Sequence, residues 1–216
     1  MANCPLCRNT KNNTSVNGAD VRQYFYCNNC HLIFVSPSFH LSSEAEKSRY
    51  QFHQNNIEDK GYVAFLNKAI QPALPFMNTA MKGLDYGCGP SPTLSKLLQQ
   101  QGYACSDYDP YFFPELNANH KYDFIFATEC FEHFFQPEKE LNTISELLND
   151  NGLLIIMTEQ WQTIEHFATW YYPKDPTHVC FYHSHTFNFI AEKFQFEILY
   201  NDKKRVVVLR KISVPT

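Results

Sequence analysis

The sequence predicts an α/β protein, in which a mostly parallel sheet covered by helices on both faces follows a small metal-bound unit. Three observations support this prediction. Apolar strands alternate with helices from Gly83 onward, four cysteines crowd the first thirty residues, and three of only seven glycines (Gly83, Gly87 and Gly89) lie in or beside one short strand. Continuous apolar strands that alternate with helices are typical of parallel sheets buried on both faces.

The composition limits the kinds of partner. With 216 residues, of which 44% are hydrophobic, the chain can form one sizeable core and a smaller unit. A net charge of -4 provides no general attraction to nucleic acids or anionic membranes. No apolar run reaches the roughly 18–20 residues of a membrane span, and the N-terminus lacks a signal-peptide pattern. We therefore expect a soluble cytoplasmic protein whose eight cysteines are thiols or metal ligands.

The first cysteines form two C-x2-C pairs, Cys4 with Cys7 and Cys27 with Cys30, separated by nineteen residues. Each pair can hold one ion from a tight turn, and two pairs complete a tetrahedral thiolate site. A polar unit of about forty residues has almost no core of its own, so zinc would supply its folding energy. The pattern resembles a zinc ribbon with a structural role. His31 is an alternative ligand, and structural thiols without metal are the other interpretation.

Residues 41–82 predict a helical connection to the sheet. The segment SSEAEKSRYQFHQ has a helix-forming composition, with Ser42 or Ser43 as its N-cap. The segment YVAFLNKAIQPAL predicts a second helix that ends at Pro72 and Pro75. The chain therefore divides into three expected parts, a zinc ribbon at 1–40, a helical linker or cap at 41–82, and the main domain at 83–216.

The main domain starts with the strand GLDYG and a helix capped by Ser91, with Pro92 in its first turn and Gly102 after its end. Three further strands are expected at YACSDYD, YDFIFATE and GLLIIMTE, with the helix PEKELNTISELLNDNG before the third. The helix FNFIAEKF and the strands FEILYND and RVVVLRK close the chain. These last two strands are close enough in sequence to pair antiparallel.

The turn that holds Gly87 and Gly89 has a nucleotide-binding arrangement. Gly87 permits the tight turn, Gly89 lets the backbone come close to a ligand, and the following helix N-terminus offers N–H groups. Asp109, twenty residues after Gly89, ends the next strand, where a carboxylate can accept hydrogen bonds from ribose hydroxyls. A dinucleotide fingerprint needs a third glycine where Pro92 stands, which disfavours a nicotinamide cofactor. A purely structural turn is the alternative.

Several motifs together resemble those of class I S-adenosylmethionine-dependent methyltransferases. They are LDYGCGPSPTLSKLL, YDP at 108–110, YDFIFATECFEH from Tyr122 and LLNDNGLLIIMTE from Leu147. The cysteine ribbon and the segment WYYPKDPTHVCFYHSHTF resemble parts of one bacterial subgroup of these enzymes. The resemblance implies a Rossmann-like methyltransferase fold with an antiparallel last strand. Only residues 110–120 occupy the place of another helix and strand of the family, so we expect the third strand to be shortened or absent.

The resemblance also implies which residues hold S-adenosylmethionine. Around the methionine end of the cofactor it places Asp85, Gly87, Cys88 and Gly89. It makes Asp109 the carboxylate that binds the ribose. It places Thr128 and Glu129, which follow the FIFA strand, beside the cofactor. The residue that reads adenine stays unassigned. We therefore expect S-adenosylmethionine as the cofactor and one structural zinc ion.

The expected catalytic residues are His133, which the resemblance places near the transferred methyl group, and His178. Methyl transfer from a sulfonium is an in-line displacement, so the protein mainly positions the acceptor. A histidine can act as general base if the acceptor is a hydroxyl or an acidic carbon. His166, His183 and His185 are weaker candidates, and each histidine has the alternative of a structural role.

The aromatic segment HFATWYYPKDPTHVCFYHSH follows a strand at the carboxyl edge, where open sheets bind ligands. Rings with polar tips predict an acceptor pocket, and packing against the zinc ribbon is the alternative. The histidines of the segment suggest a second metal only weakly, because their H-x-H spacing lacks a clear set of acids.

The sequence favours a methyltransferase that acts on the oxygen, carbon or nitrogen of a small molecule. An RNA methyltransferase that grips its substrate with the ribbon is an alternative, for which Arg8, Lys11 and Arg22 are a thin supply of positive charge. A non-catalytic cofactor-binding or scaffold protein is a second alternative, because the stretch between two central strands is short.

Overall fold

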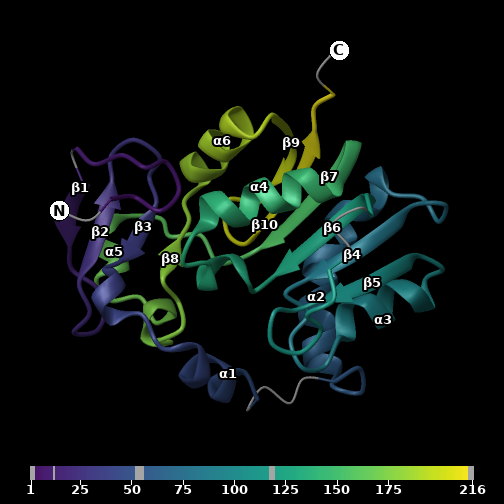
Figure 1. Cartoon of the computed structure of the whole chain (residues 1–216), viewed down its shortest axis with the longest axis horizontal. Helices are drawn as coiled ribbons and strands as arrows, with labels where there is room; N and C mark the ends of the chain where they lie inside the picture. The colour runs from purple at the N-terminus through teal and green to yellow at the C-terminus, as the bar shows by residue number, and fades with distance from the viewer. Residues whose placement is uncertain (1–2, 12, 52–55, 117–119, 214–216) are drawn as a thin grey trace.

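Two sheets lie side by side in the protein, and the chain passes from one to the other through helix α1 (Ser43–Gln51) (Figure 1). The computed structural model describes residues 3–11, 13–51, 56–116 and 120–213. The small sheet stands at one end of the molecule, on the left of Figure 1, and the larger sheet lies toward the other end.

The small sheet has four antiparallel strands in the order β1-β2-β3-β8. Three are near the N-terminus and one is far along the chain: β1 (Asn13–Val16), β2 (Tyr24–Cys27), β3 (Ile33–Val35) and β8 (Cys180–Phe181). Phe34 pairs in register with Cys180. The ring of Tyr24 meets Phe167, in the short helix α5 (Ile164–Phe167), edge-on at 5.3 Å. The N-terminal residues thus share one buried core with later parts of the chain.

The larger sheet has six strands in the order β5-β4-β6-β7-β10-β9. Their bounds in that order are Ala104–Tyr108, Lys82–Tyr86, Tyr122–Thr128, Leu148–Met157, Val206–Lys211 and Phe196–Asn201. The first four are parallel to one another, and β10 runs antiparallel to both neighbours. The predicted mostly parallel sheet with an antiparallel last strand is therefore confirmed. Among the described residues between β5 and β6, none forms a strand of this sheet, as predicted.

Helices cover both faces of this sheet, α2 (Lys60–Ala73) and α3 (Thr93–Gln100) on one, and α4 (Pro137–Leu147) and α6 (Ser184–Lys193) on the other. In β6, Phe124 belongs to the core with α2 and α3, whereas Ile125 belongs to the core with α4 and α6. Alternate side chains of a strand point to opposite faces, so a sheet covered twice requires strands that are apolar throughout.

None of the helices in the described part of the chain combines the length and the apolar character that crossing a membrane requires.

The predicted end of α2 at Pro72 is wrong. Pro72 lies inside the helix, which continues to Ala73, while Pro75 falls within the 3-10 helix η2 (Leu74–Phe76). A proline so near the end of a helix removes only one backbone hydrogen bond. Burial of Ile70 against the sheet holds the last turn in place, so packing outweighs that loss.

Two further boundaries differ from the prediction. Helix α3 begins at Thr93, and Pro92 rather than Ser91 occupies the cap position, without a side-chain cap. Helix α4 ends earlier than predicted, because Leu148 already pairs with Tyr122 in the ladder between β7 and β6. Strand pairing with a distant residue thus overrides the helical composition of the segment.

Candidate active site

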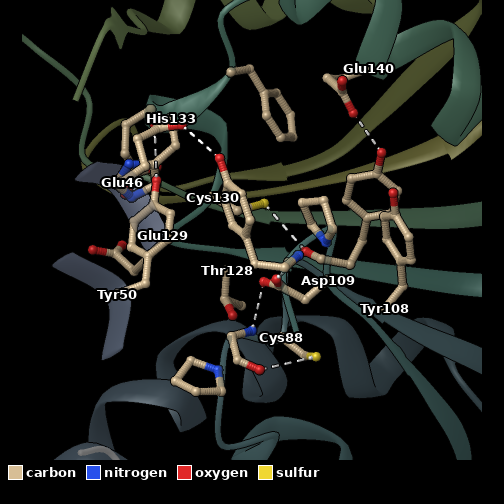
Figure 2. A pocket seen from close by; sticks show the side chains of 18 of the residues that line it. Glu46, Tyr50, Cys88, Tyr108, Asp109, Thr128, Glu129, Cys130, His133 and Glu140 are labelled. Carbon is tan, nitrogen blue, oxygen red and sulfur yellow. Dashed lines mark hydrogen bonds between the residues drawn. The ribbon is translucent and has the colours of Figure 1, made fainter. Parts of the chain in front are cut away.

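A cavity of about 570 Å³ opens at the carboxyl ends of β4, β5 and β6 (Figure 2). Its volume lies in the range of small-molecule sites, roughly 300–1,000 Å³. Most of the predicted cofactor-binding and catalytic residues line it, namely Gly87, Cys88, Gly89, Asp109, Thr128, Glu129, His133 and His178. Predicted residues from the end of β6, from the segments that follow β4, β5 and β6, and from the loop before β8, are therefore brought to one place.

The glycine turn is held against the end of β5. The N–H groups of Gly87 and Cys88 donate to the carbonyl oxygen of Tyr108 at 2.8 and 3.1 Å. Gly87 and Gly89 have φ angles of 82° and 66°, which disfavour other residues. A side chain at Gly87 would collide with Cys130 at 2.7 Å, whereas a Cβ at Gly89 would meet nothing within 4 Å. Gly89 therefore leaves open space beside the backbone, which a close-fitting ligand can use.

Asp109 anchors this turn. Its Oδ2 accepts from the N–H of Gly89 at 3.1 Å, and its Oδ1 accepts from the N–H groups of Tyr111 and Phe112 at 2.8 and 3.2 Å. The residue is only 7% exposed, yet it lines the cavity. The sequence predicts only a ligand-binding role for Asp109, whereas the structure adds that its carboxylate joins two loops.

Asp85 lies beneath the turn and is absent from the residues that line the cavity, which differs from the expectation that it lines the methionine end. The side chain is 2% exposed, and its Oδ1 has no hydrogen-bond partner among the described residues. Asp107 lies beside it in the parallel register of β4 and β5. Burial, with the negative charges of Asp107 and Asp109 nearby, raises the pKa of Asp85 to about 8.

We expect Asp85→Asn to stabilise the cofactor-free protein more at pH 8 than at pH 5. Between pH about 4 and about 8 the folded state keeps a proton on Asp85 that the unfolded chain has released, so stability falls as pH rises. Asparagine removes this dependence. One pKa unit corresponds to about 1.4 kcal/mol. The increase in the free energy of unfolding caused by Asp85→Asn should therefore be about 2–4 kcal/mol larger at pH 8 than at pH 5.

Chemical denaturation at both pH values measures this difference. Asp150→Asn, at an exposed position, is the matched control. The same change in unfolding free energy at pH 5 and pH 8 would show that the carboxyl of Asp85 is ionised throughout.

Thr128 and Glu129 follow at the end of β6. The backbone of Glu129 has φ 50°, a left-handed conformation that is uncommon outside glycine and concentrates at functional sites. Its carboxylate accepts from Arg205 at 2.9 Å, and the same guanidinium reaches Glu159 at 3.0 Å. The cavity therefore has a paired carboxylate at this wall rather than a free one.

His133 and His178 lie together at another wall, with ring centres 4.9 Å apart. His133 belongs to the 3-10 helix η3 (Phe131–His133), and its Nδ1–H donates to the carbonyl oxygen of Thr177 at 3.1 Å. The Nδ1–H of His178 donates to the carbonyl oxygen of Tyr172 at 2.8 Å. Burial lowers the pKa of His178 to about 4. The two predicted catalytic histidines are thus brought together and oriented by backbone contacts.

Helix α1 adds two cavity residues that the sequence does not predict, Glu46 and Tyr50. Figure 2 shows them at the left of the view, on the same side as His133, with Asp109 nearer the middle. Glu46 accepts from the hydroxyl of Tyr111 at 2.9 Å, which joins α1 to the loop after β5. No local pattern marks these residues, because only the path of the chain between the sheets brings α1 to the cavity.

The aromatic segment serves mainly in packing. Phe167 meets Phe181 at 5.1 Å, and Trp170 stacks on Tyr172 at 4.9 Å, all buried beside the small sheet. From this segment only His178 lines the large cavity. A second cavity of about 460 Å³ adjoins Tyr171, Tyr172, Lys174 and Asp175 of the segment. Most of these rings therefore pack beside the small sheet, as in the alternative interpretation, and do not line the large cavity.

The loop that carries His178 is fastened by Arg22 of the N-terminal part. The Arg22 guanidinium donates to the carbonyl oxygens of Pro173, Asp175, Pro176 and His178, the last at 2.9 Å. The side chain of Arg22 is only 7% exposed and also pairs with Asp20 at 2.8 Å. The N-terminal part therefore contributes directly to the position of a cavity residue.

The four N-terminal cysteines form one cluster, whose sulfur atoms all lie within 4.8 Å of one another. Cys4 Sγ is 3.5 Å from Cys30 Sγ, and Cys7 Sγ is 3.4 Å from Cys27 Sγ. Four converging thiols are the donor set of structural zinc, so the cluster is compatible with a zinc ribbon. The alternative ligand His31 lies outside it, with its Nδ1 2.7 Å from the hydroxyl of Tyr26.

Comparison with known proteins identifies a family. The family described as "Methyltransferase domain" matches residues 59–201. No curated protein sequence is similar enough to count as a relative. Among solved structures, a SAM-dependent methyltransferase from Archaeoglobus fulgidus is 15% identical over 81% of this chain and 96% of its own, with a TM-score of 0.51.

Two other solved structures are less similar in shape. A TehB-like SAM-dependent methyltransferase from Corynebacterium glutamicum is 15% identical over 79% of this chain and 100% of its own, with a TM-score of 0.46. The CurJ carbon methyltransferase is 13% identical over 67% of this chain, with a TM-score of 0.45. This chain spans about half, 52%, of the length of that CurJ chain. At 15% identity, the likeness to the Archaeoglobus fulgidus structure concerns the fold, which is the Rossmann-like methyltransferase fold.

Proposed function

The chain belongs to the methyltransferase-domain family, and we propose that it transfers a methyl group from S-adenosylmethionine to a small-molecule acceptor. One observation carries the proposal. A single cavity is lined at one part by the glycine turn and Asp109, and at another by His133 and His178. Cofactor and acceptor would therefore meet in the same space.

The cavity suits the cofactor on structural grounds. The open space at Gly89 admits a ligand close to the backbone, and the Asp109 carboxylate, fixed by three N–H groups, retains lone pairs for ribose hydroxyls. We propose that Gly87, Cys88, Thr128 and Glu129 complete the contacts. Asp85, beneath the turn, would support the turn rather than touch the cofactor.

S-adenosylmethionine supplies a methyl group already activated by the positive sulfur. The chain's part is to hold the acceptor atom in line with this carbon and to exclude water. We propose that His133 and His178 act at the acceptor, since both line the cavity and both rings are held by backbone carbonyls. Glu46 and Tyr50 of α1 would cover the acceptor from the other side.

A small acceptor is favoured over RNA because little positive charge is available on the N-terminal part. Arg22 is buried in contacts with the loop before β8, and Arg8 pairs with Glu138. RNA binding draws on cationic side chains that reach phosphates. We further propose that Cys4, Cys7, Cys27 and Cys30 bind structural zinc, that the ribbon, linker and main domain divide near residues 40 and 82, and that the protein acts in the cytoplasm.

Calorimetric titration of the zinc-loaded protein with S-adenosylhomocysteine tests the proposal, with NAD as the control ligand. We expect one-to-one binding of S-adenosylhomocysteine in the micromolar range and no heat from NAD. Transfer of labelled methyl groups from S-adenosylmethionine to the metabolite fraction of a cell extract, rather than to its RNA, should follow. Absence of S-adenosylhomocysteine binding would refute the proposed activity.

A further inference from the structure

We propose that Glu132, His133 and His178 bind one divalent transition-metal ion at the acceptor end of the large cavity. Their ligand atoms lie within 4.8 Å of one another, and all three residues line the cavity. The site is distinct from the four cysteines of the ribbon. Metal binding at this site does not depend on the proposed function, whereas its role in catalysis rests on that function.

Glu132 supplies an oxygen that needs a partner. The residue is fully buried. Its Oε1 accepts from the hydroxyl of Tyr172 at 2.6 Å, but its Oε2 has no hydrogen-bond partner among the described residues. A buried carboxylate oxygen without a partner is costly. A cation placed between this oxygen and the two imidazoles would remove the cost.

The two imidazoles are arranged as metal ligands are. Because the Nδ1–H of each ring donates to a backbone carbonyl, the lone pair of each ring is on Nε2. Such a contact to the far nitrogen is the usual means of orienting a metal-binding histidine. The backbone N–H of Val179 donates to the carbonyl of Glu132 at 2.7 Å and so ties the two ligand-bearing segments together.

The spacing leaves room for an ion. Ligand atoms bound at 2.0–2.2 Å from one ion lie roughly 3–4 Å apart, so a small contraction of the cluster would complete the coordination. Two imidazole nitrogens and one carboxylate suit zinc, iron, cobalt or nickel and leave coordination positions open. This set does not use the two histidines with H-x-H spacing, His183 and His185. It combines the adjacent residues Glu132 and His133 with His178.

The open positions define the class of acceptor as a small molecule with a hydroxyl or enol oxygen. Coordination to a cation makes such an oxygen more acidic, and its proton leaves to solvent. The oxygen–carbon bond then forms as the methyl–sulfur bond breaks, and the electron pair of that bond stays on sulfur. With the ion bound, His133 and His178 are ligands, and neither accepts the proton.

The site is tested by titrating Co²⁺ into protein that carries one equivalent of zinc per chain, taken up by the four cysteines, and by following the titration with calorimetry and visible absorption. We expect one Co²⁺ per chain in addition to zinc, without the charge-transfer band of thiolate-bound cobalt. Glu132→Gln and His178→Asn should each weaken binding about 100-fold or more, beyond the 10–100-fold that losing an outer contact costs. His166→Ala, an exposed histidine outside the cluster, should leave binding unchanged.

Both substitutions preserve the local contacts, because glutamine still accepts from Tyr172 and asparagine still donates to the carbonyl of residue 172. Co²⁺ should raise the melting temperature of the unsubstituted protein, as a ligand of the folded state does, and not that of either variant. The proposal would be overturned if no Co²⁺ binds outside the four cysteines. It would also be overturned if both variants bind Co²⁺ as tightly as the unsubstituted protein does. Because the titration contains no S-adenosylmethionine, its outcome is independent of whether the methyltransferase activity is found.

Discussion

Replacement of Cys27 by serine is expected to unfold the small sheet and to lower the melting temperature of the whole chain by more than about 10 °C. A structural zinc ion contributes about 10–16 kcal/mol of binding free energy in small zinc units, whereas a whole domain is stable by only about 5–15 kcal/mol. Tyr24, Phe34 and Phe181 belong to one continuous core. Loss of the ribbon therefore exposes buried surface of the later segments as well.

Differential scanning calorimetry together with measurement of zinc content checks this prediction. Cys88→Ser, a free thiol outside the cluster, is the control and should retain both zinc and melting temperature to within a few degrees. A Cys27→Ser protein with the melting temperature of the unsubstituted chain would mean that the core holds without the ion.

A variant that keeps all four cysteines separates the metal from the contacts of the ribbon. Arg22→Ala should retain zinc but release the loop that carries His178, since four carbonyl contacts disappear. Hydrogen exchange of the backbone amides at 173–179 should then be faster than in the unsubstituted protein. Unchanged exchange there would show that the arginine does not position the loop.

Asp109→Ala is expected to reduce S-adenosylhomocysteine affinity by about 100-fold or more. The substitution removes the proposed ribose acceptor, the contact from Gly89 that holds the glycine turn, and two contacts from Tyr111 and Phe112 within the loop after β5. Hydrogen bonds to a charged group contribute about 1.5–3 kcal/mol each, so the loss of two toward the ribose already corresponds to such a factor.

Calorimetric titration of three variants with S-adenosylhomocysteine separates loss of the ribose contact from disturbance of the local structure. Asp109→Asn keeps the shape and one acceptor oxygen, so it should bind with intermediate affinity. Asp107→Asn removes a carboxylate from β5, two residues before Asp109 and outside the cavity lining, and it should bind like the unsubstituted protein. If Asp109→Ala binds normally, the carboxylate does not read the ribose, and the proposed orientation of the cofactor is wrong.

Much of the fold follows from local patterns in the sequence. The strands of the larger sheet and the helices between them were predictable, because each depends on apolar periodicity over a few residues. The shortened third-strand region was expected from the resemblance to the methyltransferase family, and none of the described residues there joins the larger sheet. The exceptions lie where a distant partner intervenes. Leu148 joins Tyr122 in a ladder, and the two-residue strand β8 exists only because β3 is there to pair with it.

The candidate site was predictable in part. Gly87, Gly89 and Asp109 could be located because a strand, a turn and a helix succeed one another in sequence, and parallel strands bring such turns to one edge. His133 was a candidate from the resemblance and His178 from its residue type, but nothing in the sequence indicated that the two rings lie together. Glu46 gave no signal, since its helix reaches the cavity through the path of the chain rather than through its own composition.

Features whose causes are local could be predicted from the residues alone. Two C-x2-C pairs have the ligand spacing of a structural zinc site, and glycines adopt positive φ at little steric cost. Contacts between groups far apart in the sequence depend on how the whole chain folds. They include the buried carboxylate of Glu132 beside two oriented imidazoles, and Arg22 of the N-terminal part, which holds the loop of one of them. Contacts of this kind arise from the order of strands and the packing of two cores, which no short stretch of sequence encodes.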